Sequence, residues 1–182
     1  LDTDHEPLAA TYSERFFEAF RAFDPDPYLT GTREAFDHHG VDADAERFAD
    51  ALVEAEVEGT IVDEGTHDAL DRLSEDASLG LLTNGLADLQ RRKLEQHGLF
   101  ERFDVYLPSY DVESHKPSAE IFEAARNRLD AEAYVYVGDS LESDVRPARE
   151  AGFLPVHLDR TAEAGAVTVD GLGTLGRTAE LL

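Results

Sequence analysis

Three short stretches of the sequence carry residue types that could bind a phosphate group together with a metal ion. The first is Thr83-Asn84-Gly85, where a hydroxyl and an amide side chain precede a glycine that opens a predicted helix. The hydroxyl could donate a hydrogen bond to a phosphate oxygen, and the backbone N–H groups at the helix start would present positive partial charge. The alternative is an ordinary turn punctuated by Asn-Gly.

The second stretch contains Lys116, which is one of only two lysines in the chain and precedes Pro117. Pro117 is expected at the first position of a helix, where its missing N–H removes no hydrogen bond. An ammonium group at this junction could neutralise a bound anion or keep a nearby carboxylate ionised. The alternative is a solvent-exposed lysine, although the helix dipole disfavours a positive charge at this end.

The third stretch runs from Gly138 to Asp144 and places two carboxylates, Asp139 and Asp144, around a predicted helix start. Carboxylate oxygens suit Mg²⁺, a hard ion that is usually held by one or two carboxylates with waters and substrate phosphate. The alternative is that either aspartate caps the helix, because acidic side chains stabilise that end.

Alternating strands and helices would bring these three stretches together. Each stretch follows a short apolar run, and the carboxyl ends of parallel strands are where such sheets bind ligands. Strands are predicted at residues 79–83, 103–107, 134–137, 154–158 and 167–169. Helices are predicted at residues 65–73, 86–97, 118–129 and 144–151. This alternation predicts a parallel α/β core with helices on its faces.

A helical block precedes the alternating part. Apolar residues recur at three and four positions, which predicts helices at residues 8–23, 30–39 and 43–56. We expect a small all-helical cap at residues 7–61, inserted into a core made of residues 1–6 and 62–182.

Taken in order, Thr83-Asn84-Gly85, Lys116-Pro117 and Gly138-Asp139 with Asp144 resemble motifs two, three and four of the haloacid dehalogenase (HAD) superfamily. The similarity covers nearly the whole chain. Adjoining residues that also match the family pattern are Gln90, Lys93-Leu94, Phe103-Asp104, Ile121-Phe122, Asp144-Val145 and Ala151-Gly152. The resemblance implies a three-layer, Rossmann-like α/β core carrying a helical cap.

The resemblance also implies a function, the Mg²⁺-dependent hydrolysis of phosphate monoesters of small metabolites through an aspartyl-phosphate. Thr83, Asn84 and Gly85 would bind the phosphoryl oxygens, with Thr83 contributing to catalysis. Lys116 would offset the negative charge of nucleophile and phosphate. Asp139 would bind Mg²⁺ directly, and Asp144 through water or by orienting its neighbours.

The first motif of the family, an apolar strand ending in Asp-x-Asp-Gly-Thr, has no good match. Leu1-Asp2-Thr3 resembles the residues that follow this motif, so we expect the nucleophile and the central strand of the sheet upstream of Leu1. The chain by itself would then be inactive. The alternative is that Asp2 and Asp4 form a degenerate catalytic pair.

Two other functions remain open at this point. A 2-haloacid dehalogenase would need no metal, and the pair Asp139 and Asp144 argues against it. A non-catalytic HAD-like binding protein would explain a missing nucleophile, and the sequence upstream of Leu1 would distinguish it. A phosphonate hydrolase is disfavoured because residues 7–61 contain no lysine for a Schiff base.

The amino-acid composition of the chain limits the classes of molecule that it could bind. The 16 basic and 40 acidic side chains give a formal net charge of −24, which would repel nucleic acid and anionic membranes. No apolar run is long enough to span a bilayer, and the absence of cysteine excludes disulfides and thiolate chemistry. We expect a cytoplasmic protein acting on a small phosphorylated metabolite. Its acidity with so little lysine suggests a halophilic adaptation to high salt.

Overall fold

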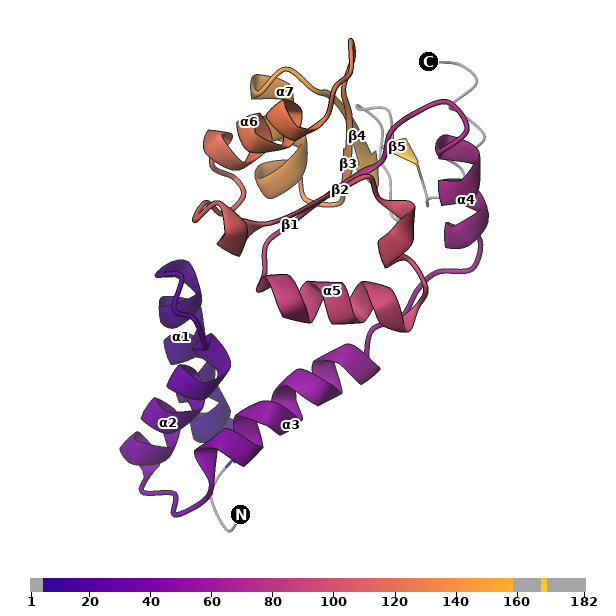
Figure 1. Cartoon of the computed structure of the whole chain (residues 1–182). Coiled ribbons are helices and arrows are strands. Elements are labelled where there is room, and N and C mark those ends of the chain that lie inside the picture. Colours follow the sequence, from indigo (N-terminus) through magenta and orange to yellow (C-terminus); the bar gives the residue numbers. More distant parts are fainter. Residues whose placement is uncertain (1–4, 159–167, 170–182) are drawn as a thin grey trace. The chain divides into compact units, whose positions relative to one another are not determined.

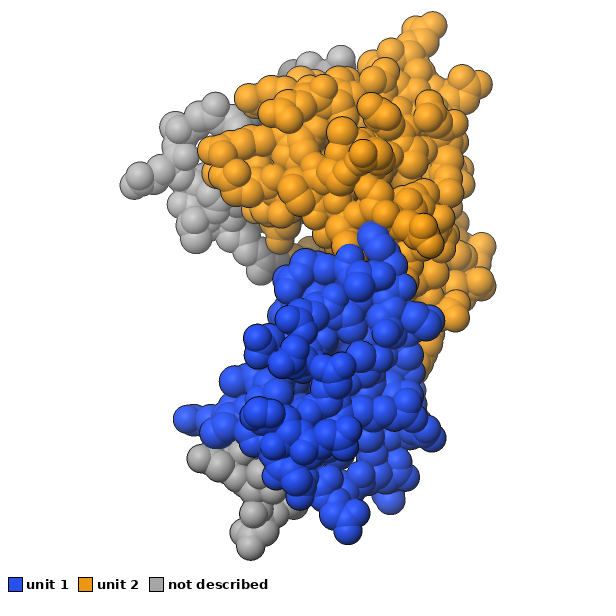
Figure 2. Space-filling view, turned by 90° about the vertical axis from the view of Figure 1, so that its left-hand side faces the viewer, with its two compact units in different colours: residues 1–60 blue, residues 61–182 orange. Residues whose placement is uncertain are grey.

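The computed structural model describes residues 5–158 and 168–169. The chain divides into two compact units, residues 1–60 and residues 61–182, which Figure 2 colours separately. The predicted boundaries of a cap at residues 7–61 and a core at residues 1–6 and 62–182 stay a prediction. The alternative catalytic pair, Asp2 and Asp4, lies outside the described residues.

The first unit is built from the three helices expected there. They are α1 (His5–Arg21), α2 (Pro27–His39) and α3 (Ala45–Glu58) (Figure 1). Aspartates begin two of them, because the Asp26 carboxylate accepts the Leu29 N–H at 3.0 Å and the Asp44 carboxylate accepts the Arg47 N–H at 3.1 Å. Helix α2 therefore starts three residues before the predicted residue 30.

Close packing joins α1 and α2. A Cβ at Gly31 would lie 2.9 Å from the Phe16 backbone nitrogen, so only glycine allows this approach without a shift. Leu8 on α1 packs against Ala35 and Phe36 on α2 in a small buried cluster. The apolar periodicity of the sequence thus becomes the contact face of this helix pair.

The described part of the second unit contains five short strands, all parallel to their neighbours. They are β1 (Gly80–Thr83), β2 (Val105–Pro108), β3 (Val135–Gly138), β4 (Leu154–Leu158) and β5 (Thr168–Val169). Among the described residues they form two sheets, β1-β2 and β3-β4-β5, instead of one. The reason is that β1 and β3 each pair along one edge only, toward β2 and β4. The expected central strand between them stays a prediction.

Helices separate the strands β1 to β4 in sequence, as an α/β fold requires. The α-helices are α4 (Thr66–Leu73), α5 (Ala87–Gln96), α6 (Ala119–Arg128) and α7 (Arg146–Glu150). Shorter turns are η1 (Phe100–Arg102), η2 (Ser109–Asp111) and η3 (Leu141–Val145). Helix α6 packs on both β1 and β2. None of the helices in the described ranges is long and apolar enough to cross a membrane.

One hydrophobic core serves both sheets. Phe122 of α6, Leu107 of β2, Tyr136 of β3 and Ala148 of α7 are buried in the same cluster. The ring of Phe122 meets that of Tyr136 edge-on, with centroids 5.2 Å apart. This core places the carboxyl ends of β1, β2 and β3 in one rigid neighbourhood.

Two predictions about helix starts in the second unit are also wrong. Pro117 is not the first residue of a helix, because α6 begins at Ala119 with Ser118 as its N-cap. The helix predicted at residues 144–151 begins earlier, since η3 opens at Leu141 as one π-type turn and continues into α7. Both errors fall in the loops where the candidate site residues lie.

Candidate active site

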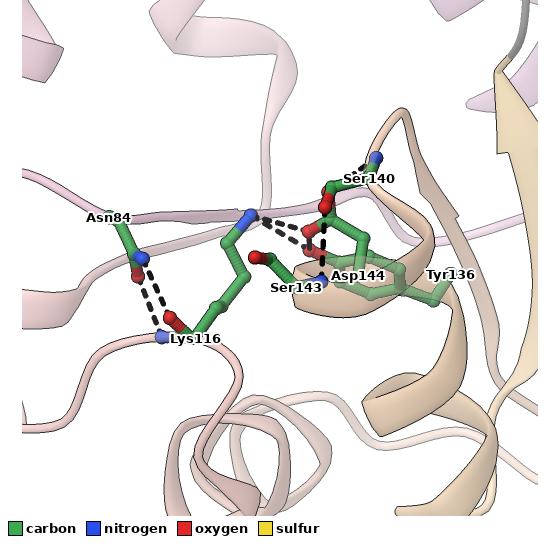
Figure 3. A network of polar contacts seen from close by, with 6 residues as sticks. All are labelled: Asn84, Lys116, Tyr136, Ser140, Ser143 and Asp144. Atoms are coloured by element: carbon green, nitrogen blue, oxygen red, sulfur yellow. Dashed lines mark hydrogen bonds and ion pairs between the residues drawn. The ribbon is translucent and has the colours of Figure 1, made fainter.

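Polar side chains follow the carboxyl ends of three strands in the second unit. Thr83 is the last residue of β1, Lys116 lies in the loop after β2, and Asp139 directly follows β3. Six residues of this region form the polar network in Figure 3. The strand-end position predicted for these residues is therefore the one observed, as expected for ligand sites of parallel sheets.

The Lys116 ammonium is the centre of the network. Its Nζ donates to Asp144 Oδ1 at 2.7 Å and to the Tyr136 hydroxyl at 3.2 Å. The Tyr136 hydroxyl in turn donates to the same Asp144 oxygen at 2.9 Å. The side chains of Lys116 and Asp144 are 15% and 5% exposed, so this ion pair is largely shielded from solvent. Lys116 is thus not a surface lysine.

Local backbone structure brings Asp144 to Lys116. The Ser140 N–H donates to Asp144 Oδ2 at 3.1 Å, and Ser140 Oγ accepts the Ser143 N–H at 3.0 Å, which caps the turn η3. A Cβ at Gly138 would lie 2.5 Å from Asp144 Cβ, a distance that real Cβ contacts do not reach. Glycine at the end of β3 therefore makes room for the buried carboxylate.

Asn84 fixes the backbone of Lys116 from the neighbouring loop. Its side-chain oxygen accepts the Lys116 N–H at 2.8 Å, and its side-chain nitrogen donates to the Lys116 carbonyl at 3.0 Å. Figure 3 shows the amide of Asn84 facing the Lys116 backbone. The sequence predicted a phosphate-binding role for Asn84, and the structure adds that its side chain ties the two loops together.

Ser109, which sequence analysis did not identify, also connects these two loops. Its hydroxyl is fully buried, accepts the Gly85 N–H at 3.0 Å and lies 2.8 Å from His115 Nδ1. The Gly85 N–H therefore already has an acceptor within the protein. A Cβ at Gly85 would lie 2.6 Å from the Gln90 side-chain nitrogen, so any other residue there would displace the Gln90 side chain.

Thr83 and Asp139 differ from the other candidates because neither side chain joins the network. Within the described ranges, the half-buried Thr83 hydroxyl has no hydrogen-bond partner, and the exposed Asp139 carboxylate accepts none. The Asp139 backbone carbonyl, in contrast, accepts a hydrogen bond from His157 Nε2 at 3.0 Å. The protein thus holds the Asp139 backbone and leaves its carboxylate open.

These surroundings bear directly on metal binding. No group of three or more His, Asp or Glu side chains that could hold a metal ion occurs among the described residues. Mg²⁺ needs only one or two protein carboxylates when waters and phosphate complete its shell, and the open Asp139 carboxylate fits that requirement. Asp144 fits less well as a direct ligand, because its oxygens already accept bonds from Lys116, Tyr136 and Ser140.

The network sets the ionisation of its members. Burial alone would raise the pKa of Asp144, but the hydrogen bond and charge of Lys116, with the hydrogen bonds from Tyr136 and Ser140, outweigh it and lower the pKa. Burial, followed by the charge and hydrogen bond of Asp144, raises the pKa of Tyr136 far above its usual range. Asp144 is therefore a carboxylate and Tyr136 a neutral phenol at neutral pH.

The chain matches known proteins in its sequence. A family model of haloacid dehalogenase-like hydrolases matches residues 2–152. The phosphoserine phosphatase of Thermus thermophilus is 42% identical over 85 residues, which cover 46% of this chain and 34% of the relative. The ribulose-1,5-bisphosphate 5-phosphatase of Halopiger xanaduensis is 31% identical over 175 residues, which cover 91% of this chain and 73% of the relative.

The fold matches as well. A crystal structure of the HAD-hydrolase YfnB of Bacillus subtilis, bound to magnesium, superimposes with a TM-score of 0.74. That match covers 96% of this chain and 83% of YfnB at 22% identity, so it shows a common fold. Three of the curated relatives are longer proteins, of which the matched segment of the chain spans about a third, 34% to 36%.

Proposed function

The chain belongs to the haloacid dehalogenase-like hydrolases, and on that basis we propose that it acts in a Mg²⁺-dependent phosphatase for phosphate monoesters of small metabolites. Two curated relatives named as phosphatases support this proposal, one of them similar along 91% of the chain. The structural observation that carries it is the shielded pair of Lys116 and Asp144, which holds an ammonium beside the loop of Thr83 and Asn84.

In this proposal, the chain's own residues bind and polarise the phosphate. The Thr83 hydroxyl and the backbone N–H of Asn84 donate hydrogen bonds to phosphoryl oxygens. Lys116 supplies positive charge, which favours the more negative transition state. Asp144 keeps the ammonium in place and charged. Gly85 contributes through the shape of its loop, because its N–H donates to Ser109.

Asp139 holds the metal in this scheme, through a carboxylate that accepts no hydrogen bond from the described residues. When bound, Mg²⁺ neutralises the phosphate and polarises its oxygens. We place the attacking carboxylate in the first motif of the family, which is expected before Leu1. It would form an aspartyl-phosphate, with release of the alcohol, and water would hydrolyse that ester to free phosphate.

The test is an assay of p-nitrophenyl phosphate hydrolysis by the complete gene product. We expect EDTA to abolish the activity, Mg²⁺ to restore it, and Asp139→Asn to be nearly inactive with an unchanged circular dichroism spectrum. Glu142→Gln is the matched control, since it removes an exposed carboxylate three residues further along the chain, whose ion-pair partner among the described residues is the exposed Arg146. Activity that survives in Asp139→Asn or in EDTA would contradict the metal role.

A further inference from the structure

We propose that the hydroxyl of Tyr136 is a positioning group for Lys116, which fixes the ammonium so that one N–H remains directed to an incoming phosphate. The kinetic consequence of this inference rests on the proposed phosphatase function. The contact itself does not, and it can be tested on a chain without any activity.

The donors and acceptors of the network support a defined arrangement. A lysine ammonium has three N–H donors and no acceptor. Two of the donors of Lys116 are used, one by Asp144 and one by the Tyr136 hydroxyl. No other acceptor for the ammonium lies among the described residues. The third N–H is therefore the one available to a ligand.

The Tyr136 hydroxyl contacts both Lys116 and Asp144 and so restricts the ion pair that these two residues form. With Asp144 as its only partner, the ammonium could rotate about the carboxylate oxygen. Such an ion pair would fix the distance between the two groups but not the direction of the remaining N–H bonds. The hydroxyl accepts from Lys116 at 3.2 Å and donates to Asp144 at 2.9 Å, so each of the three groups contacts the other two. Asn84 fixes the backbone of Lys116 at the other end of the side chain.

The chemistry of Tyr136 suits this role. Burial and the charge of Asp144 raise the pKa of the phenol, so the hydroxyl keeps its proton and can donate while it accepts. The ring itself is fixed by edge-on contacts to Phe122 and Phe153, with centroids 5.2 Å and 5.8 Å away. A phenylalanine would make the same ring contacts, so the core alone does not require the hydroxyl.

A pair of substitutions separates the hydroxyl from the ring. Tyr136→Phe removes the hydroxyl beside Lys116. Tyr134→Phe is the matched control, because Tyr134 precedes the same strand and also meets Phe153 edge-on, yet its hydroxyl donates only to the backbone carbonyls of Leu129 and Arg126. Both variants keep the charge of the chain, and thermal melting shows whether either loses stability.

The direct readout is the rate at which N-hydroxysuccinimidyl acetate acetylates Lys116, followed by mass spectrometry. Lys93 is the only other lysine and serves as the internal reference, while the terminal amine is resolved by mass. Because Lys116 loses one of its two acceptors, we expect the ratio of the Lys116 to the Lys93 rate to rise about two- to tenfold in Tyr136→Phe. An unchanged ratio, or an equal rise in Tyr134→Phe, would overturn the proposal.

A third variant tests whether looser packing of the core would by itself increase the reactivity of Lys116. Phe153→Leu removes a ring that packs on Tyr136 and keeps the hydroxyl. We expect its labelling ratio to stay near that of wild type even if its melting temperature falls. A rise that matches Tyr136→Phe would mean that packing, and not the hydroxyl, holds Lys116, and would overturn the proposal.

The kinetic readout uses the complete gene product with p-nitrophenyl phosphate and Mg²⁺. We expect Tyr136→Phe to lower kcat about two- to tenfold with little change in KM, because a loosely held ammonium loses transition-state stabilisation first. Tyr134→Phe should match wild type. An unchanged kcat in Tyr136→Phe would overturn the positioning role, whereas a wild type without activity would contradict the proposed function and leave the labelling to decide.

Discussion

At the scale of single residues, Lys116 is held by hydrogen bonds at both its backbone and its ammonium group. Asn84 binds both polar groups of its backbone, and Asp144 and Tyr136 bind its ammonium. A lysine in a flexible surface position would carry the same charge without a fixed direction. The cost of removing Lys116 should therefore exceed the cost of removing one hydrogen bond to the substrate.

That comparison is a prediction for two variants of the complete gene product. Thr83→Ala removes one hydrogen bond to a charged oxygen and should lower kcat/KM about 10- to 100-fold. Lys116→Met removes the compensating charge and should lower it by about 10²–10³-fold. Lys93→Met is the control and should retain full activity. Lys116→Met activity close to wild type would exclude the proposed role of Lys116.

Asp144 gives a prediction about pH. Its pKa is lower in the folded chain than the ordinary value of 3.8, so the stabilisation is present above that value and is lost as pH falls through the folded pKa. Asp144→Asn should therefore lower the free energy of unfolding by about 1–3 kcal/mol near pH 7. The difference from wild type should shrink below about pH 4, because Asp144 of the unfolded wild-type chain then takes up a proton, and Asp144 of the folded chain follows at lower pH.

Chemical denaturation at several pH values measures this difference. The control is Asp130→Asn, which changes an exposed carboxylate and should have little effect at either pH. A difference between wild type and Asp144→Asn that stays constant down to pH 3 would show that the network does not stabilise the ionised form.

Sequence alone could find Thr83, Lys116, Asp139 and Asp144, because each lies at the end of an apolar run that predicts a strand or in the segment that follows it. It could not assign their partners. Asn84 and Lys116 are 32 positions apart, and an amide's fit to one particular backbone unit follows only from the folded loops. Tyr136 has the pattern of an apolar strand residue, and nothing in its alternation with Val135 and Val137 distinguishes a hydroxyl aimed at a lysine.

At the scale of elements, the turn η3 (Leu141–Val145) decides where Asp144 lies. The sequence predicts a helix that begins at residue 144. In the structure, Ser140 is the N-cap of η3, so the turn begins before that residue. The observed turn points one aspartate inward and leaves the other exposed. Strand positions were easier to predict, since short apolar runs bounded by turn residues are typical of buried strands.

Gly138 provides the test of this element. Gly138→Ala places a Cβ 2.5 Å from Asp144 Cβ, so η3 must shift. We expect a loss of stability of about 1–3 kcal/mol and faster acetylation of Lys116, because the shifted carboxylate no longer holds it. Gly98→Ala is the control, since it strains a backbone with φ of +63° but its Cβ meets nothing within 4 Å. It should lower stability without changing the reactivity of Lys116.

At the scale of the whole molecule, the main feature is the large excess of acidic over basic side chains. The net charge of −24 is spread over 182 residues with only two lysines, and like charges at this density repel one another in dilute buffer. The shielded pair of Lys116 and Asp144 is screened much less by salt than exposed charges are. The adaptation to high salt that the composition predicts would therefore concern the surface and not the proposed site.

The corresponding prediction is that the melting temperature rises steeply with KCl. Most of the rise should occur between about 0.1 and 1 M, where the screening length falls from about 10 Å to about 3 Å. Sucrose at matched osmolality is the control, because it adds no ions. A melting temperature that is independent of KCl over this range would contradict the adaptation.

The most direct test of the central claim measures the reaction class itself. Phosphate released from p-nitrophenyl phosphate and chloride released from 2-chloropropionate are quantified side by side for the complete gene product, each with Mg²⁺ and with EDTA. The account predicts phosphate release that requires Mg²⁺ and no chloride release. Chloride release that persists in EDTA, or neither product under any condition, would contradict it.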